Sequence, residues 1–593
     1  MKNAFVIVTL SGLLTACALA PSPRATAARI EAMPAPFEPP GAALDDAGAE
    51  DASLPKVQLT SELLYKLMKA ELEFQDGNWQ SPYMTMLGLA QQTRDPRLAR
   101  RATEIALAAK QGGEALAAVR LWRELAPGSD EAAQAYLGLV VLADDLGEAE
   151  RIFARRLQEA GPAARGVVML QAQQYLARAT SKPAAEALLD KLLAPYANTV
   201  EARVLLAQSA FARGEHDLAQ RHAQAALAQK PDSELAVLTL AQVTPDQDAV
   251  SALLSRFLAA NPKAREVRAA HARVLVTQKR YEPARKEFER MLADQPDSAG
   301  TLYALGIMSM QLNDNPGAER YFGRFIEVIE KDPDETRDPG KVLLILSQLA
   351  EERGDLKAAG RWLAKVGEED AASHFAAQLK RGQLMARLGD LAGARAFLGA
   401  LETDEPSRQA QVLITQAQLL REAGNNEAAY AVLADGARRF PMNPDLLYDY
   451  ALIAEKTGRV DIMETNLRAV MAQAPDNHHA YNALGYSLAE RNVRLVEALA
   501  LIDKALKMAP GDPFIMDSMG WVQYRLGKLD EAEASLRNAY ALRSDADIGV
   551  HLGEVLWHKG KKADAIKLWR EAHAKDPKND TLKSTLARLH AKL

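Results

Sequence analysis

The chain of 593 residues is several times longer than the roughly 100–150 residues of a typical compact domain, so it either divides into domains or grows by repetition. Hydrophobic residues make up 48% of it but aromatic residues only 6%, and Ala and Leu dominate, which favours helices over strands. A net charge of −6 is close to balance over this length and supplies no basic excess for a phosphate backbone. The composition therefore predicts an all-α protein and argues against a nucleic-acid partner.

Residues 1–16 have the features of a bacterial secretion signal. Lys2 precedes an apolar run from Ala4 to Leu14, which is too short to span a bilayer permanently, and small residues lead up to the only cysteine, Cys17. The run Leu14-Thr15-Ala16-Cys17 resembles the bacterial lipobox, which implies cleavage before Cys17 and attachment of lipid to its thiol. The alternative is an ordinary signal peptide that contains a cysteine by chance.

Residues 17–58 are expected to form a flexible tether that starts at the lipidated cysteine. They are rich in proline and acidic residues and hold one aromatic residue, Phe37, so they cannot bury enough apolar surface to offset their ordering entropy. Ala18 follows the cysteine, whereas Asp at this position retains lipoproteins in the inner membrane of related bacteria. We therefore expect a lipid anchor in the outer membrane, with the folded part facing the periplasm.

From residue 59 onward, helix-length segments follow one another, with small residues and prolines recurring at regular intervals. Near the C-terminus, Gly485, Gly520 and Gly553 each follow Leu or Met and recur every 33 to 35 residues. A small residue lets two helices approach where they cross, and the prolines at 510 and 577 end a helix because proline lacks the N–H of the next turn. This pattern resembles the tetratricopeptide repeat (TPR), whose period is about 34 residues.

Weaker copies of the same spacing extend the pattern upstream. They comprise Ala115, Val119, Trp122 and Pro127; Ala219, Ala223, Ala226 and Pro231; Ala284, Phe288, Met291 and Pro296; Leu305-Gly306 with Ala318 and Phe322; and Met463, Leu467, Val470 and Pro475. The resemblance implies a TPR superhelical solenoid of roughly 14–16 antiparallel helix pairs. We expect an N-terminal array over 59–331 and a C-terminal array over 341–593 with a polar capping helix, although one continuous kinked superhelix is the alternative.

No motif for catalysis or cofactor binding occurs in the sequence. It contains no P-loop, no dinucleotide-binding glycine pattern and no Gly-x-Ser-x-Gly elbow. His551, Glu554 and His558 fall near one helix face, but the two histidines are separated by about 10 Å of helical rise and no third ligand is evident. The sequence thus predicts no catalytic residue, no cofactor, no metal site and no small-molecule substrate.

The TPR resemblance implies a partner-binding groove lined by positions 2, 5, 9, 12 and 13 of the first helix of each repeat. On the three clearest repeats this register selects His479, Asn482 and Tyr486; Phe514, Asp517, Trp521, Tyr524 and Arg525; and Glu554, Trp557 and His558. Aromatic and Arg side chains are enriched at hot spots of protein interfaces. The alternative for Trp521 and Trp557 is burial between repeats, and the sequence does not decide between the two.

Four segments are similar to one group of large TPR outer-membrane lipoproteins. They run from Leu64 to Leu67 with Ala70-Glu71, from Tyr481 to Tyr486, from Asp517 to Trp521 and from His551 to Trp557. The resemblance implies an adaptor that binds a periplasmic carboxyl-terminal processing protease and helps it degrade peptidoglycan cross-link hydrolases. A scaffold for envelope assembly, in secretion, pilus formation or exopolysaccharide export, is the alternative. An enzyme would require catalytic groups that the sequence lacks.

Overall fold

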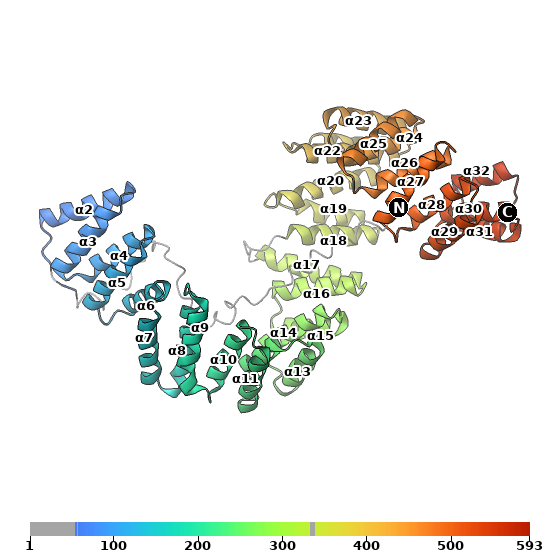
Figure 1. Ribbon diagram of the computed structural model, residues 1–593. Coiled ribbons are helices and arrows are strands. Elements are labelled where there is room, and N and C mark those ends of the chain that lie inside the picture. Colours follow the sequence, from blue (N-terminus) through green and yellow to red (C-terminus); the bar gives the residue numbers. More distant parts are fainter. Residues whose placement is uncertain (1–53, 56, 332–338) are drawn as a thin grey trace. The chain divides into compact units, whose positions relative to one another are not determined.

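The computed structural model describes residues 54–55, 57–331 and 339–593 (Figure 1). In these ranges the chain forms 31 α-helices, one short 3-10 helix, η1 (Ala194–Tyr196), and no strand, so the predicted all-α class is confirmed. The described helices group into two compact units that divide between Val328 and Ile329. The expected signal peptide, Cys17 and nearly all of the expected tether lie outside the described residues.

The helices are numbered in chain order. Those of the first unit are α2 (Ser61–Gln75), α3 (Gln80–Thr93), α4 (Pro96–Ala108), α5 (Gly112–Leu125), α6 (Asp130–Leu142), α7 (Leu146–Glu159), α8 (Pro162–Leu176), α9 (Lys182–Leu193), α10 (Val200–Ala212), α11 (His216–Gln229), α12 (Glu234–Val243), α13 (Gln247–Ala260), α14 (Arg265–Thr277), α15 (Tyr281–Asp294) and α16 (Ala299–Gln311). The next helix, α17 (Asn315–Lys331), crosses the division between the units.

The second unit continues with helices of the same kind. They are α18 (Gly340–Glu352), α19 (Leu356–Ala364), α20 (Ala371–Arg387), α21 (Leu391–Gly399), α22 (Pro406–Glu422), α23 (Asn426–Arg439), α24 (Pro444–Lys456), α25 (Val460–Gln473), α26 (His478–Glu490), α27 (Leu495–Met508), α28 (Pro513–Arg525), α29 (Leu529–Leu542), α30 (Ala546–His558), α31 (Lys562–Lys575) and α32 (Asp580–Leu589). None of the helices in the described part of the chain is both long and apolar enough to cross a membrane.

The described helices form fifteen pairs, from α2–α3 to α30–α31, followed by the single helix α32. This number lies within the range expected from the repeat period. In each pair the even-numbered helix comes first, and a short turn returns the chain so that the second helix packs against it. The tetratricopeptide-type stack of helix pairs is therefore confirmed.

Local sequence sets where these helices begin and end. In the second unit, asparagine or aspartate caps the N-termini of five first helices and of the single helix α32 by accepting a hydrogen bond from a backbone N–H of the first turn: Asp370, Asn443, Asn477, Asp512, Asp545 and Asn579. Second helices α25, α27 and α31 end just before Pro475, Pro510 and Pro577. Between α28 and α29, Gly527 adopts a left-handed φ of +78° and its N–H bonds to the carbonyl of Tyr524, which closes the turn.

The two helices of a pair play different parts in the second unit. First helices contact the next first helix along the stack, as α26 does with α28, α28 with α30 and α30 with α32. Contacts between successive second helices are sparse. The first helices therefore form a closely packed layer, and side chains one repeat apart can meet on it.

The recurring glycine marks the point where the two helices of a pair cross. A Cβ atom on Gly485, Gly520 or Gly553 would fall within 2.6 Å of the side chain of Ile502, Leu536 or Trp569, respectively, on the second helix. In the first unit, a Cβ atom on Gly306 of α16 would lie 2.4 Å from Cε1 of Phe322, which is fully buried on α17. Glycine thus admits a large partner at each seam.

We expect Gly306→Ala to destabilise the protein by roughly 1–3 kcal/mol, because Phe322 has no free space into which it can move. Gly323, on the adjacent helix α17, is the matched control because no atom lies within 4 Å of its ideal Cβ position. Gly323→Ala should stabilise the protein by about 0.5–1 kcal/mol through backbone entropy. Urea unfolding followed by circular dichroism measures both changes, and equal effects at the two positions would contradict the proposed packing role of Gly306.

Candidate protein-binding face

The eleven residues predicted to line a groove all lie on α26, α28 and α30, but their exposure differs widely. His479, Phe514 and His558 are exposed, whereas Asn482, Tyr486, Tyr524, Arg525 and Trp557 are half-buried and Asp517, Trp521 and Glu554 are buried. We call this side of α26, α28, α30 and α32 the first-helix face. Because a partner cannot reach a buried side chain, the three buried residues do not contact a partner and instead pack beneath the exposed residues of this face. The other eight stay predicted contact residues.

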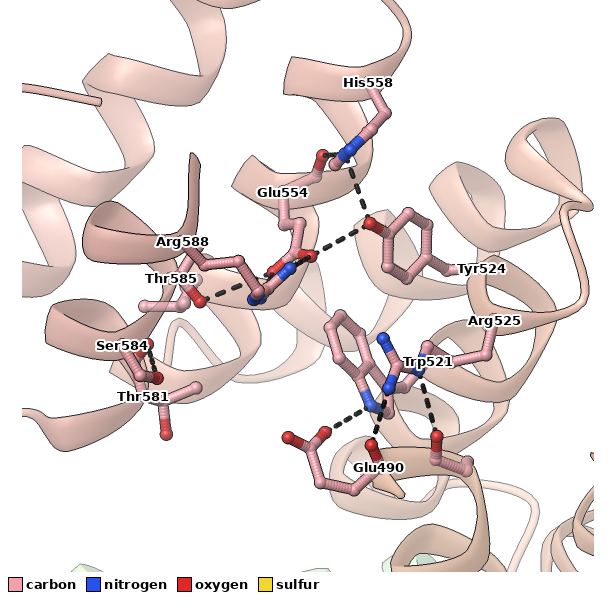
Figure 2. A network of polar contacts seen from close by, with 12 residues as sticks. Glu490, Trp521, Tyr524, Arg525, Glu554, His558, Thr581, Ser584, Thr585 and Arg588 are labelled. Carbon is pink, nitrogen blue, oxygen red and sulfur yellow. Dashed lines mark hydrogen bonds and ion pairs between the residues drawn. The ribbon is translucent and has the colours of Figure 1, made fainter. Parts of the chain in front are cut away.

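Trp521 is part of the packing between neighbouring first helices. Its side chain is 2% exposed, and its indole Nε1 donates a hydrogen bond of 2.7 Å to a carboxylate oxygen of Glu490 on α26 (Figure 2). On the other side its ring stacks on His551 of α30, with 4.3 Å between ring centroids. Of the two alternatives for this tryptophan, burial between repeats is the one that the structure supports.

Trp557 is only half-buried, so part of its ring remains open to solvent. Its ring centroid lies 5.4 Å from that of Trp569, the large residue at the seam of the same helix pair. Lys562 lies 4.8 Å from the Trp557 ring centroid in a cation–π arrangement. Trp557 therefore rests on the core while offering an accessible edge.

Arg525 ties the end of α26 to α28. Its Nε and Nη2 atoms donate hydrogen bonds of 3.0 and 2.6 Å to the carbonyls of Ala489 and Glu490, which lie in the last turn of α26 (Figure 2). The carbonyl of Ala489 also accepts from the backbone N–H of Asn492, so the guanidinium adds a second bond there and bonds to the carbonyl of Glu490 at the helix end, where its charge matches the helix dipole. The same guanidinium lies 5.5 Å from the ring of Trp521.

A buried ion pair joins α28 to α30 beneath the first-helix face. Nδ1 of His551 lies 2.9 Å from Oδ2 of Asp517, and both side chains are buried. Burial alone would lower the pKa of His551, but the adjacent Asp517 carboxylate outweighs it and raises that pKa above its ordinary value. The other ring nitrogen, Nε2, has no hydrogen-bond partner. The imidazole is thus held through its Nδ1 side alone.

Glu554 connects α28, α30 and α32. Its carboxylate is 0% exposed and accepts two hydrogen bonds from Arg588, at 2.6 and 2.8 Å, and one of 2.9 Å from the Tyr524 hydroxyl (Figure 2). Burial favours the neutral acid, but Arg588 and Tyr524 outweigh it and lower the pKa of Glu554. The Tyr524 hydroxyl also lies 3.2 Å from Nδ1 of His558.

Four residues of this network occupy the same position in their helices. Tyr486, Trp521, Glu554 and Arg588 are each the ninth residue of α26, α28, α30 and α32. Burial, together with the nearby carboxylates of Glu490 and Asp517, raises the pKa of Tyr486, so its phenol is neutral at physiological pH. The charged groups of Glu554 and Arg588 satisfy each other. This arrangement stiffens a surface and leaves neither carboxylate nor guanidinium free for acid–base chemistry.

Three residues of this network were missed as contributors to the face by the sequence reasoning. Glu490 is the thirteenth residue of α26 and Arg588 is the ninth of α32, so the repeat register could have found both. His551 was expected on a polar helix face instead of in a metal site, whereas it is buried and pairs with Asp517. Among the described residues no group of three His, Cys, Asp or Glu side chains is placed to hold a metal ion.

Removing Arg588 should leave the fully buried Glu554 without its principal partner. We expect Arg588→Ala to destabilise the second unit by roughly 2–3 kcal/mol, because a charged acceptor loses two hydrogen bonds in a site closed to water. Adding Glu554→Gln should recover part of this loss, which guanidinium chloride unfolding can measure. The control Arg438→Ala removes an exposed arginine from an (i, i+3) pair with Asp435 and should cost less than about 0.5 kcal/mol. Equal losses for the two arginines would contradict a structural role of the Glu554 pair.

The pair of Asp517 and His551 predicts a defined pH dependence. Because the folded-state pKa of His551 is raised, its contribution to stability is fully present below the unfolded pKa of about 6.5 and is lost as pH rises through the folded value. Asp517→Asn should therefore destabilise the protein most near pH 6 and progressively less at higher pH. Unfolding midpoints measured between pH 6 and 9 test this. Asp564→Asn, which changes an exposed carboxylate on α31, should show no such trend.

Comparison with known proteins agrees with the helix-pair architecture. The sequence model of the tetratricopeptide-repeat family matches residues 269–335, 414–461, 464–513 and 518–580. A TPR repeat-containing protein of Pseudomonas aeruginosa is 38% identical over 209 residues, which cover 35% of this chain and 35% of that protein. A protein O-mannosyl-transferase of Homo sapiens is 25% identical over 224 residues, which cover 36% of this chain and 25% of that protein. The matches thus span about a third or less of these curated relatives.

Solved structures of repeat proteins resemble parts of the chain. A thermophilic TPR protein of Thermus thermophilus matches with a TM-score of 0.28 and 25% identity, over 30% of this chain and 97% of that one. A tetratricopeptide repeat protein of Parabacteroides merdae matches with a TM-score of 0.33 and 17% identity, over 42% and 97% of the two chains. The stacked helix pairs, the glycine seams and the matches to the sequence model thus agree in showing tetratricopeptide-type repeats in this chain, with the matched segments all lying between residues 269 and 580.

Proposed function

We propose that the chain is a non-catalytic scaffold anchored by lipid to the outer membrane, where it brings a periplasmic carboxyl-terminal processing protease together with cell-wall hydrolases. The coarser part of this role, protein binding, follows from the tetratricopeptide repeats. The finer part draws on the similarity of four segments to adaptor lipoproteins and on the motif at Cys17. Both are features of the sequence, so the protease is the point that an experiment must test.

One observation carries the scaffold role, namely that side chains on neighbouring first helices hold each other in place across repeats. Trp521 bonds to Glu490 of the preceding first helix, and Tyr524 bonds to Glu554 of the following one. Arg588 then extends the connection to α32. A surface whose side chains are already ordered loses less entropy when it binds, which favours recognition of a protein segment.

The accessible side chains of this face are suited to contact with a polypeptide. Phe514 is 44% exposed, with the guanidinium of Arg543 lying 5.0 Å from its ring. Trp557 offers part of its ring, and His558 is exposed beside it. Aromatic residues next to cationic and polar groups form the usual centre of a protein-binding surface. No pair of these groups is arranged as nucleophile and base, which fits binding without turnover.

The decisive experiment isolates the full chain with a C-terminal tag from detergent-solubilised envelopes and identifies co-purifying proteins by mass spectrometry. We expect the protease to dominate, and loss of the scaffold to raise cell-wall hydrolase levels. The double variant Phe514→Ala, His558→Ala should lower protease recovery at least tenfold without changing helicity, because both side chains are exposed on the first-helix face. The control Met442→Ala changes an exposed residue in the turn between α23 and α24 and should recover the protease normally.

Recovery of export-channel or pilus components without any protease would reject the adaptor proposal in favour of an envelope-assembly scaffold. Equal recovery of the protease by the double variant and by the control would place its docking site outside the first-helix face.

A further inference from the structure

The first helix of the described stack, α2, carries apolar residues on two opposite sides. Ala70 is buried in the core of the first unit, and Leu67 and Phe74 pack against that core. Facing solvent are Leu64, Tyr65, Met68 and Leu72, which are between 43% and 66% exposed. Their spacing of three and four residues places them in one stripe along the helix. We call these four residues the α2 stripe.

Terminal helices of a repeat stack need a polar outer face to remain soluble. The last helix, α32, meets this requirement, since its exposed residues include Asp580, Lys583, Ser584 and Arg588. The α2 stripe does not meet it. Single exposed apolar residues are ordinary, but four in one continuous row on one helix indicate a surface that another protein surface covers.

We infer that the α2 stripe is covered by the α2 stripe of a second copy of this chain, with the two helices antiparallel about a two-fold axis near Met68. Three of its four residues are symmetric about Met68, because Leu64 and Leu72 lie four positions before and after it, whereas Tyr65 would lie opposite Glu71 of the second copy. In an antiparallel pair, Met68 meets Met68 of the second copy, and Leu64 meets Leu72 of the second copy. A two-fold interface requires this self-complementarity, whereas contact with an unrelated partner does not.

The charged residues beside the stripe permit such a pairing. Lys66 bonds to Glu62 at 2.7 Å, and Lys69 lies 3.7 Å from Glu73, so both lysines are already matched within their own helix. Glu71 is paired with Arg101 of α4. Two copies can therefore approach without bringing unmatched like charges together, which would otherwise oppose the dimer.

The size of the contact indicates a modest affinity. With Leu59, which is also exposed just before the N-cap of α2, the stripes of two copies would bury on the order of 1,000 Å². This area lies at the lower end of specific interfaces. We expect a reversible dimer with a dissociation constant of about 1–100 μM.

Cysteine cross-linking of the full chain tests the axis directly. The sequence has a single cysteine, Cys17, so Met68→Cys introduces one new thiol. Because a residue on a two-fold axis lies opposite its own counterpart, mild oxidation should convert most of this variant into a disulfide-linked dimer on a non-reducing gel. Met442→Cys is the control, since it replaces a methionine in the second unit that is even more exposed than Met68. It should cross-link no more than the parent chain, which reports any contribution from Cys17.

Sedimentation velocity gives an independent measurement in solution. Met68→Glu should raise the dissociation constant at least tenfold, because two carboxylates would meet at the axis, while Met442→Glu should leave it unchanged. A parent chain that remains monomeric at 100 μM, with no excess cross-linking at position 68, would overturn the inference. Protection of the Met68→Cys thiol from alkylation in such a monomer would instead assign the stripe to residues 1–53 of the same chain. Protection only in the presence of the protease would assign it to that partner.

Discussion

The close crossing of the two helices in each pair is the constraint on which the rest of the structure depends. A small residue on the first helix admits a large one from the second, as Gly553 admits Trp569. The Trp569 side chain is fully buried, and its indole N–H donates a hydrogen bond to the carbonyl of Val550. This bond fixes the orientation of the indole ring against the first helix. Similar seams recur at Gly485 and Gly520, so the two helices cross in the same way in three successive pairs of the second unit.

Contacts between successive first helices convert sequence periodicity into spatial contact. Residues about one repeat apart, such as Trp521 and Glu490 or Tyr524 and Glu554, become neighbours on adjacent first helices. The first-helix face therefore comes from regular stacking, with local contacts repeated along the chain. Its chemistry depends on which side chain occupies each equivalent position, and a substitution at an exposed one, such as Phe514, alters the face without removing a buried contact between helices.

Sequence reasoning could predict the elements and their register because the signals are local. Glycine at the crossing, asparagine or aspartate at the N-cap and proline after the second helix act within one pair. The burial of Trp521 could not be predicted in this way, since it depends on Glu490 in the preceding repeat and His551 in the following one. Likewise, the sequence around Glu554 indicates an exposed acid, because its partner Arg588 lies one repeat later, in the final helix. Periodicity identifies the facing positions, but the identity of neighbours in adjacent repeats decides which side chains remain accessible.

The two ends of the described stack then differ in a way that limits assembly. At α32, Arg588 bonds to Glu554 and most of the exposed residues are polar, so that helix carries no row of large apolar side chains like that of α2. At α2 the apolar stripe remains open. A two-fold contact between α2 stripes uses the open surface of both copies at once, so growth stops at two chains instead of continuing into a filament. The first-helix face on α26, α28 and α30 takes no part in this contact, so each dimer presents two such faces. Two tethered faces bind a multivalent or oligomeric partner more tightly than one, because the second binding event occurs at a high effective concentration.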